Sequence, residues 1–222
     1  MMMVGLKLEI EQGVMEGHKC FAAIYDFLMA RAEKTFMRAI RSEVVGKARG
    51  RTLEIGCGTG ASFPYYPDPS AVTATEPDPF MLQRARRRAR LMGIPLTIIR
   101  ARAELLPFPD SSFDTVISVF VFCSVQDVRR SLAEVRRVLR SHGELRFYEH
   151  VRYDHRWGAL AQDAVTPLWQ WLGGGCHPNR DTPRLLEEAG FRIVRLEVFK
   201  LDPPVPPLLF IRPQVLGVAR PV

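Results

Sequence analysis

The feature that most constrains this chain is a short apolar segment that runs directly into a turn with glycines at alternate positions. It reads Leu53-Glu54-Ile55-Gly56-Cys57-Gly58-Thr59-Gly60. A glycine turn lets a ligand approach backbone that no side chain shields, and the following helix offers free N–H groups and its positive dipole end. Glu76, at the end of the next apolar run, stands where a carboxylate can accept hydrogen bonds from both hydroxyls of a ribose. Together these features predict a nucleoside-cofactor site in a doubly wound α/β sheet.

Apolar runs and helical patterns alternate through the rest of the chain. Strands are predicted near residues 51–55, 71–75, 96–100, 114–120 and 144–151. Helices are predicted from Phe21 to about Ala48, from Asp78 to Gly93, from Ser124 to a stop at Gly143, and ahead of Gly190. Residues 191–201 and 208–219 predict two closing strands that form an antiparallel hairpin through the prolines at 203–207. The fold class is therefore a Rossmann-like three-layer α/β sandwich with a seven-stranded, mostly parallel sheet.

Length and composition favour a single soluble domain. The chain has 222 residues, 47% of them hydrophobic and 25% charged. We expect residues 1–48 to form a helical lid, 50–151 a cofactor-binding core, and 152–222 an acceptor-side loop with the closing strands. The four cysteines show no paired spacing, and the sequence has neither a run of 18 apolar residues nor a signal peptide. These observations predict a cytoplasmic protein with reduced thiols.

The basic residues raise the question of an anionic partner. The net charge is +7, and the tightest basic run is Arg84-Ala85-Arg86-Arg87-Arg88-Ala89-Arg90. This run could bind nucleic acid or anionic lipid. The simpler interpretation is the solvated face of a helix whose opposite face, Met81, Leu82, Ala85, Ala89 and Met92, packs inward. We favour that interpretation because no aromatic residues interleave with the arginines, so nucleic acid is not an expected partner.

The glycine spacing alone leaves the cofactor open, because dinucleotide enzymes share this turn and also tolerate alanine at the position of Ala61. The flanking residues are more specific. After Glu76 come Glu104-Leu105-Leu106-Pro107-Phe108-Pro109-Asp110-Ser111-Ser112-Phe113-Asp114, then Arg136-Arg137-Val138-Leu139-Arg140 and Gly143. In this order, over residues 50–150, they closely resemble the class I S-adenosylmethionine-dependent methyltransferases. The resemblance implies S-adenosylmethionine as the cofactor.

The resemblance also implies roles for individual residues. Gly56, Gly58 and Gly60 would wrap the methionine part of the cofactor, with Cys57 inside the turn and Glu54 beneath it. Glu76 would hold the ribose hydroxyls, with Pro77 and Met81 beside the adenosine. Ala103 and Glu104 would lie at the adenine edge, and Val119 and Phe120 would line the pocket wall. Arg102 departs from the family pattern, which commonly has Asp there.

Tyr25 lies in a segment, residues 22–26, that resembles the helix covering the cofactor in many of these enzymes. It is either part of such a lid or an aromatic residue of the core. On the acceptor side, His150 follows the strand predicted at 144–151, at the edge where open α/β sheets bind ligands. It could be a catalytic base for a thiol or hydroxyl, or a histidine that only orders the loop.

Two further segments could shape the acceptor pocket. Residues 157–171 contain Trp157, Trp169 and Trp171, which provide either aromatic pocket walls or core packing. Residues 176–181 are expected as a loop over the pocket. A zinc site built on Cys176 and His177 would lack two more ligands at suitable spacing, so no metal is expected.

Finer similarities concern the acceptor. Residues 122–125, 149–151 and 175–180 resemble thiol S-methyltransferases of the methyltransferase-like family and their bacterial relatives, often labelled phospholipid or quinone methyltransferases. The resemblance implies methyl transfer to a small molecule: a thiol, an amine or a lipid-like acceptor. The human thiol S-methyltransferases of this family carry an N-terminal membrane anchor, which residues 1–20 of this sequence do not contain. A peripheral membrane contact therefore remains open. An RNA or protein methyltransferase and a non-catalytic cofactor-binding regulator remain alternatives, and the oligomeric state is open.

Overall fold

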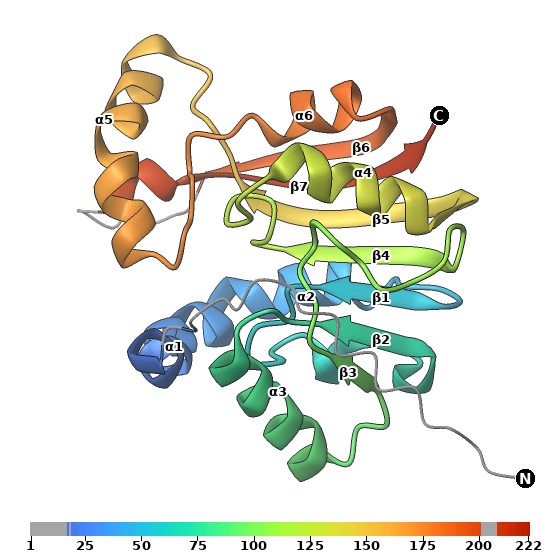
Figure 1. Cartoon of the computed structure of the whole chain (residues 1–222). Coiled ribbons are helices and arrows are strands. Elements are labelled where there is room, and N and C mark those ends of the chain that lie inside the picture. Colours follow the sequence, from blue (N-terminus) through green and yellow to red (C-terminus); the bar gives the residue numbers. More distant parts are fainter. Residues whose placement is uncertain (1–16, 18, 201–207) are drawn as a thin grey trace, which may run out of the picture.

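The computed structural model describes residues 17, 19–200 and 208–222, and its fold is the predicted Rossmann-like sandwich (Figure 1). The strands are β1 Thr52–Ile55, β2 Val72–Thr75, β3 Thr97–Ile99, β4 Phe113–Val119, β5 Leu139–His150, β6 Phe191–Lys200 and β7 Pro213–Pro221. The helices are α1 Lys19–Ala32, α2 Arg38–Val44, α3 Pro79–Met92, α4 Val128–Val138, α5 Arg156–Leu172 and α6 Thr182–Glu188, with a π-helical turn at Glu33–Met37 between α1 and α2. Short 3₁₀ turns occupy Phe63–Tyr65, Pro69–Ala71 and Leu208–Ile211.

The seven strands form one sheet in the order β3-β2-β1-β4-β5-β7-β6. The first five are parallel, and β7 runs antiparallel between β5 and β6. The two closing strands therefore pair as predicted, while the proline-rich turn at 203–207 lies outside the described residues. The strand order reverses between β1 and β4, which is where doubly wound sheets bind ligands, beyond the carboxyl ends of the strands.

The two faces of the sheet are covered by different helices because successive strand residues point to opposite sides. Val116 and Phe147 pack with residues of α4 and α6 in one core cluster. Their chain neighbours Ile117 and Tyr148 pack with residues of α2 and α3 in the other. This alternation gives the three layers of the sandwich and leaves α1 and α5 beyond the carboxyl edge of the parallel strands (Figure 1).

Helix α3 carries the basic run and begins and ends where the sequence predicts. The carboxylate of Asp78 accepts hydrogen bonds from the N–H groups of Phe80 and Met81, and Gly93 ends the helix in the left-handed conformation. The predicted inward face is buried except at its last position, Met92, which is 51% exposed. That part of the prediction was wrong, because Met92 lies in the final turn, where the helix leaves the sheet.

Helix α4 ends earlier than predicted. It stops at Val138 and β5 begins at Leu139, whereas the sequence pattern placed the helix stop at Gly143. The reason is tertiary: Ser111 and Ser112 donate their N–H groups to the carbonyls of Arg137 and Val138, and Leu139 pairs with β4. These hydrogen bonds satisfy carbonyls of the last helical turn, so the helix ends at Val138 and the chain continues as a strand.

The segment predicted to supply aromatic walls is the surface helix α5. Trp157 and Trp171 are 78% and 81% exposed, so they neither line a pocket nor pack in the core. Trp169 alone packs edge-on against another ring, that of Phe210, at a centroid distance of 4.9 Å. No helix within the described ranges is long and apolar enough to cross a membrane.

Candidate active site

The glycine turn follows β1 at the reversal point of the sheet, and its middle glycine faces open space. Gly58 has φ +57°, and a Cβ built there would meet no atom within 4 Å. At Gly56 and Gly60, by contrast, a Cβ would collide with Val121 and Phe63. Two of the glycines are therefore required by packing within the protein, whereas Gly58 leaves a cradle that a ligand can enter.

Glu76 links the end of β2 to this turn. Its Oε2 accepts the N–H of Gly58 at 2.8 Å, and its Oε1 accepts the N–H of Asp78 at 2.9 Å. Each carboxylate oxygen retains a lone pair for a further donor. Burial raises the pKa of Glu76 to about 7, so the group is costly to ionise without an additional donor.

Glu54 lies in β1 beneath the turn, as predicted, and is only 2% exposed. Burial raises the pKa of its carboxyl group to about 7. Hydrogen bonding to Ser62 and Tyr66 opposes this rise, but Oε2 makes no hydrogen bond of normal geometry in the described part of the chain. A buried carboxylate oxygen without a donor is unfavourable, and a ligand ammonium group would satisfy it.

The other predicted cofactor residues lie around this turn and the loops beside it. Cys57, Met81 and Ala103 are buried. The carboxylate of Glu104 accepts N–H groups of Gln126 and Asp127, so its side chain holds the loop before α4. Contact of Pro77, Met81, Ala103 and Glu104 with an adenosine stays a prediction.

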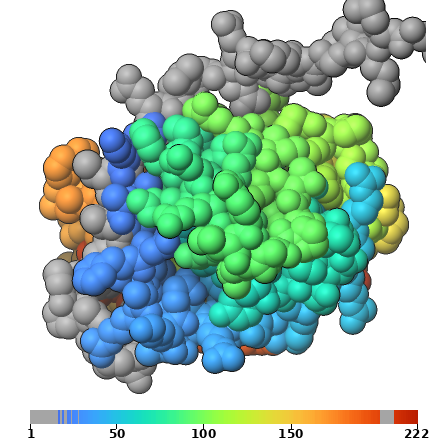
Figure 2. Space-filling view, turned by 90° about the horizontal axis from the view of Figure 1, so that it is seen from below, coloured from blue at the N-terminus to red at the C-terminus, as the bar shows by residue number. Residues whose placement is uncertain are grey.

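Helix α1 is tied directly to the glycine turn. The hydroxyl of Thr59 donates to the carboxylate of Asp26 at 2.6 Å, and the other carboxylate oxygen pairs with Arg88 of α3 at 3.1 Å. In the space-filling view the segment of α1 and α2 lies against that of α3 (Figure 2). Tyr25, next to Asp26, is half-buried, and burial raises the pKa of its phenol to about 12. This position fits the lid interpretation of Tyr25, while residues 1–16 of the predicted lid lie outside the described residues.

A buried carboxylate orders the loop after β4. Glu149 is fully buried, and its oxygens accept the Ser118 hydroxyl at 2.7 Å and the backbone N–H groups of residues 121, 122 and 123 at 3.0–3.1 Å. The preceding residue, Phe120, has φ +58°, which is strained for a residue with a side chain. The hydrogen bonds to Glu149 therefore hold a strained loop in place beside the glycine turn.

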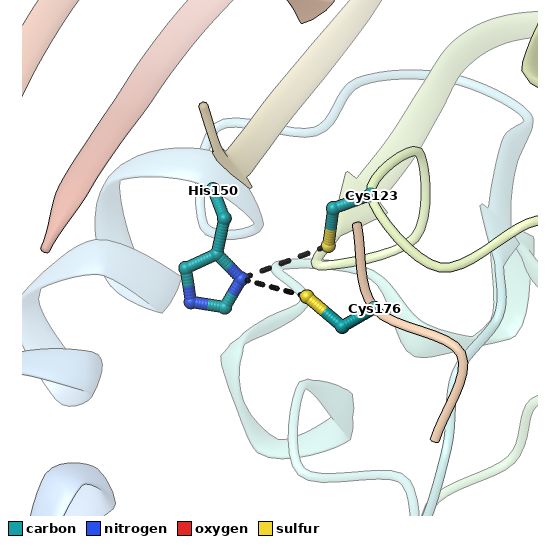
Figure 3. Close-up of side chains that lie close together, drawn as sticks. All are labelled: Cys123, His150 and Cys176. Atoms are coloured by element: carbon teal, nitrogen blue, oxygen red, sulfur yellow. Dashed lines mark hydrogen bonds between the residues drawn. The ribbon is translucent and has the colours of Figure 1, made fainter. Parts of the chain in front are cut away.

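His150 extends from the end of β5 toward that loop. Its imidazole stacks on the ring of Phe120, with centroids 4.3 Å apart and planes 18° apart. Its Nδ1 lies 3.7 Å from the Sγ of Cys123 and 3.6 Å from the Sγ of Cys176, and both sulfurs lie at the same edge of the ring (Figure 3). Hydrogen bonding between the two thiols raises the pKa of Cys123 and lowers that of Cys176.

The loop after α5 closes this side by hydrogen bonds to backbone carbonyls of the loop after β4. The N–H of His177 donates to the carbonyl of Cys123 at 2.6 Å, and Arg180 donates to the carbonyl of Phe122 at 2.5 Å. Cys176 joins Cys123 and His150, whereas the Nδ1 of His177 has no partner among the described residues. The sequence analysis assigned no role of their own to Cys123 and Asp26, and it considered Glu149 only as a residue beside the acceptor pocket, because each acts through a contact with a residue distant in the chain.

Comparisons with known proteins identify the family to which this chain belongs. Human thiol S-methyltransferase TMT1B is 33% identical over 195 residues, which cover 82% of this chain and 79% of that protein. The chain belongs to the S-adenosylmethionine-dependent methyltransferases. The family described as Methyltransferase domain matches residues 53–147 of this methyltransferase. Phosphatidylethanolamine N-methyltransferase of Cereibacter sphaeroides is 34% identical over 190 residues, covering 85% of this chain and 90% of that protein.

Solved structures agree on the fold. A SAM-dependent methyltransferase from Aquifex aeolicus aligns with a TM-score of 0.65 at 18% identity, covering 93% of this chain and all of that one. The cofactor of the methyltransferase is S-adenosylmethionine, and the residues present fit it. The cradle at Gly58 has room for the methionine part, Glu54 has a free oxygen for an ammonium, and Glu76 has lone pairs for two hydroxyls.

Proposed function

We propose that this methyltransferase acts on a small-molecule acceptor and that the acceptor is a thiol. The observation that carries the proposal is the stack of His150 on Phe120 beside two sulfurs, at the carboxyl edge that also bears the cofactor turn. The similarity to thiol S-methyltransferases points the same way.

The protein's part in this chemistry is positioning. The cofactor supplies a methyl group on a sulfonium, an electrophile that a thiolate attacks without acid catalysis. Glu54, Gly58 and Glu76 would fix the cofactor, and Phe120 and His150 would form the wall against which the acceptor lies. Holding two reactants in line can contribute about 7–11 kcal/mol toward the barrier. His150 is the proposed catalytic residue, since it lies where it can accept a proton from the acceptor.

Helix α1 and the loop at 176–181 would exclude water from this site. Asp26 ties α1 to the turn, so we assign the segment up to residue 48 as the lid of the domain, with residues 50–151 as its core and 152–222 as its acceptor side. Water exclusion matters because the sulfonium charge disappears in the transition state. The free thiols of Cys57, Cys123 and Cys176 support a reducing compartment, which we propose to be the cytoplasm.

The proposal is tested by incubating the protein with methyl-labelled S-adenosylmethionine and a panel of small thiols, amines, phospholipid vesicles, RNA and protein. We expect label in the thiol fraction, at a rate that depends on His150. Labelling of RNA or protein alone would assign the methyltransferase to a macromolecular substrate. Cofactor binding without transfer to any member of the panel would favour a regulatory protein.

A phospholipid amine is the second candidate acceptor. It is favoured by the similarity to phosphatidylethanolamine N-methyltransferase and by one face of α5, on which Trp157, Leu160, Leu168 and Trp171 are exposed. These residues recur at helical spacing, and tryptophan favours the membrane–water interface. The net charge of +7 suits an anionic lipid surface. We therefore propose peripheral membrane contact through α5 as the route to such an acceptor.

A further inference from the structure

Three potential metal ligands from distant parts of the chain meet beside the proposed acceptor site. Cys123 follows β4, His150 ends β5, and Cys176 follows α5; their ligand atoms all lie within 4.8 Å of one another. Figure 3 shows both sulfurs directed at the same nitrogen of the imidazole. No metal was expected from the sequence, because a site built on Cys176 and His177 lacked two further ligands at suitable spacing.

The distances in the cluster suit a tetrahedral cation. With Zn–S near 2.3 Å and Zn–N near 2.0–2.1 Å, a tetrahedral angle places sulfur and nitrogen about 3.6 Å apart. The two Sγ–Nδ1 distances are 3.7 and 3.6 Å. Two thiolates and one imidazole are also the donor set that thiophilic divalent cations prefer.

Hydrogen bonding alone explains this convergence less well. The Nδ1 of a neutral imidazole offers one lone pair or one proton, so it can form one good hydrogen bond in the ring plane. Two sulfurs nevertheless approach it at nearly the same distance. A cation between the three atoms would engage a lone pair from each of them at once.

We propose that Cys123, His150 and Cys176 form a binding site for a zinc-class cation, whose fourth position takes the acceptor thiol. The acceptor part of this inference rests on the proposed function; the metal site itself does not. Two thiolates neutralise a divalent cation, which makes the buried set electrically balanced. Three protein ligands with an open fourth position are typical of catalytic rather than structural zinc.

The surrounding structure holds Cys123 and His150 in place without the cation. Glu149 accepts the N–H of Cys123 at 3.1 Å, and His177 donates to the carbonyl of the same residue. The His150 ring is fixed by its stack on Phe120. Cys123 and Cys176 are buried while His150 is half-buried, so the cluster is reached from the side of the imidazole. Such supporting contacts are what orient ligands in metal sites.

At this position a cation would prepare the acceptor for methylation. An incoming thiol would bind through sulfur and release its proton to solvent, because coordination favours the thiolate. The methylated product is a neutral thioether, a weaker ligand, and would leave. With the cation bound, His150 would be a ligand through Nδ1 and would not accept the proton of the acceptor thiol; without it, His150 keeps the role of base given under the proposed function.

The first experiment measures metal in the whole wild-type protein, purified with zinc and a reductant that contains no thiol. We expect one zinc per chain after gel filtration, by elemental mass spectrometry. Replacement by Co²⁺ should give the visible bands of a tetrahedral site together with thiolate-to-metal charge transfer. Adding 2-mercaptoethanol should shift these bands, as expected for an open fourth position. Wild-type protein without zinc, or a Co²⁺ spectrum without thiolate bands, would overturn the proposal.

The second experiment compares variants. Cys123→Ser, Cys176→Ser and His150→Gln should each weaken zinc binding by at least about a hundredfold, since even outer-shell partners are worth about 10–100-fold. His142→Gln, which alters an exposed histidine outside the cluster, should retain the zinc. Binding of S-adenosylhomocysteine by calorimetry checks that every variant is folded. Unchanged zinc affinity in the folded cluster variants would overturn the assignment. So would wild-type protein that is alkylated immediately after purification, contains no zinc and shows a Cys123–Cys176 disulfide by mass spectrometry.

Activity separates this inference from the proposed function. If zinc-stripped protein methylates thiols at the full rate, the thiol-methyltransferase function stands and the role of the cation in holding the acceptor is wrong. If zinc binds as described but no thiol is methylated, the metal site stands and the proposed function is wrong. Loss of thiol methylation on stripping, with recovery on adding zinc, supports both.

Discussion

The carboxylate of Asp26 in α1 accepts a hydrogen bond from the hydroxyl of Thr59 in the glycine turn, with 2.6 Å between Oδ1 and Oγ1. This bond couples the lid to the cofactor turn. We predict that Thr59→Val weakens cofactor binding about fivefold, which corresponds to roughly 1 kcal/mol for one hydrogen bond. Calorimetry with S-adenosylhomocysteine measures the effect. Thr35→Val is the matched control, because that hydroxyl donates to the carbonyls of Arg31 and Ala32, one turn earlier in the chain and away from the glycine turn. An equal loss in both variants would contradict the coupling.

Gly58 offers a sharper test of the cofactor cradle. Gly58→Val should abolish cofactor binding, because the new side chain would fill the space that the methionine part needs. Gly93→Val is an unusually close control: Gly93 also has positive φ (+64°) and open space at its Cβ, but it ends α3. Both variants should lose similar stability, about 1–2 kcal/mol from backbone strain, and only the first should lose the cofactor. Measurable cofactor affinity in Gly58→Val would place the ligand elsewhere.

Glu76 should make cofactor binding depend on pH. Burial raises its pKa in the free protein to about 7, and only the ionised carboxylate can accept from both ribose hydroxyls. Affinity should therefore rise with pH between pH 6 and pH 8, by roughly tenfold for each such carboxyl. The pKa of Glu54 is also raised to about 7 and acts in the same direction, so the step should disappear only in Glu54→Gln/Glu76→Gln. A wild-type affinity that is flat across this range would refute the assignment.

The raised pKa of Glu76 has the opposite effect on the stability of the free protein, which should fall as the pH rises. The folded state binds the Glu76 proton more tightly than the unfolded chain, whose carboxyl has the ordinary value of 4.5. This contribution to stability is therefore complete below pH 4.5 and is lost as the pH rises through about 7. Glu76→Gln should reduce the pH dependence of the free energy of unfolding in this range, and Glu54→Gln/Glu76→Gln should reduce it further, because the pKa of Glu54 is raised in the same way.

His150 separates acceptor chemistry from cofactor binding. We predict that His150→Ala lowers methyl transfer at least tenfold, while the affinity for S-adenosylhomocysteine changes by no more than a few-fold, since no cofactor contact is assigned to it. Single-turnover assays and calorimetry measure the two quantities. His142→Ala, an exposed histidine at the other end of β5, should leave both unchanged. Wild-type turnover in the His150 variant on every acceptor would remove it from the mechanism.

The exposed face of α5 makes a prediction about lipid. Trp157→Ser/Trp171→Ser should abolish co-sedimentation with vesicles that contain anionic lipid and leave the thermal unfolding temperature nearly unchanged, because both side chains are solvent-exposed. Val194→Ser, an exposed apolar position on β6, should bind vesicles like the wild type. Failure of the wild type to bind such vesicles would rule out α5 as a membrane contact.

The local sequence determined most of the fold, including the glycine turn and the place of Glu76 beside it. The apolar run before Gly56, the cap at Asp78 and the end at Gly93 act over a few residues, so their signals can be recognised directly in the sequence. The positions of Gly58 and Glu76 are fixed by the turn and by the end of the next strand. For these elements the sequence pattern and the structure agree because the interactions that form them are local.

Tertiary structure decided the rest. Helix α4 ends at Val138 because a distant loop takes its last carbonyls, and Glu149 is a loop anchor because three N–H groups from after β4 converge on it. Cys123, His150 and Cys176 are 27 and 26 residues apart, with no spacing rule to connect them. They meet because the parallel strands β4 and β5 end at the same edge and the loop after α5 folds back onto it. Sheet register and loop packing, which are nonlocal, bring the three side chains together.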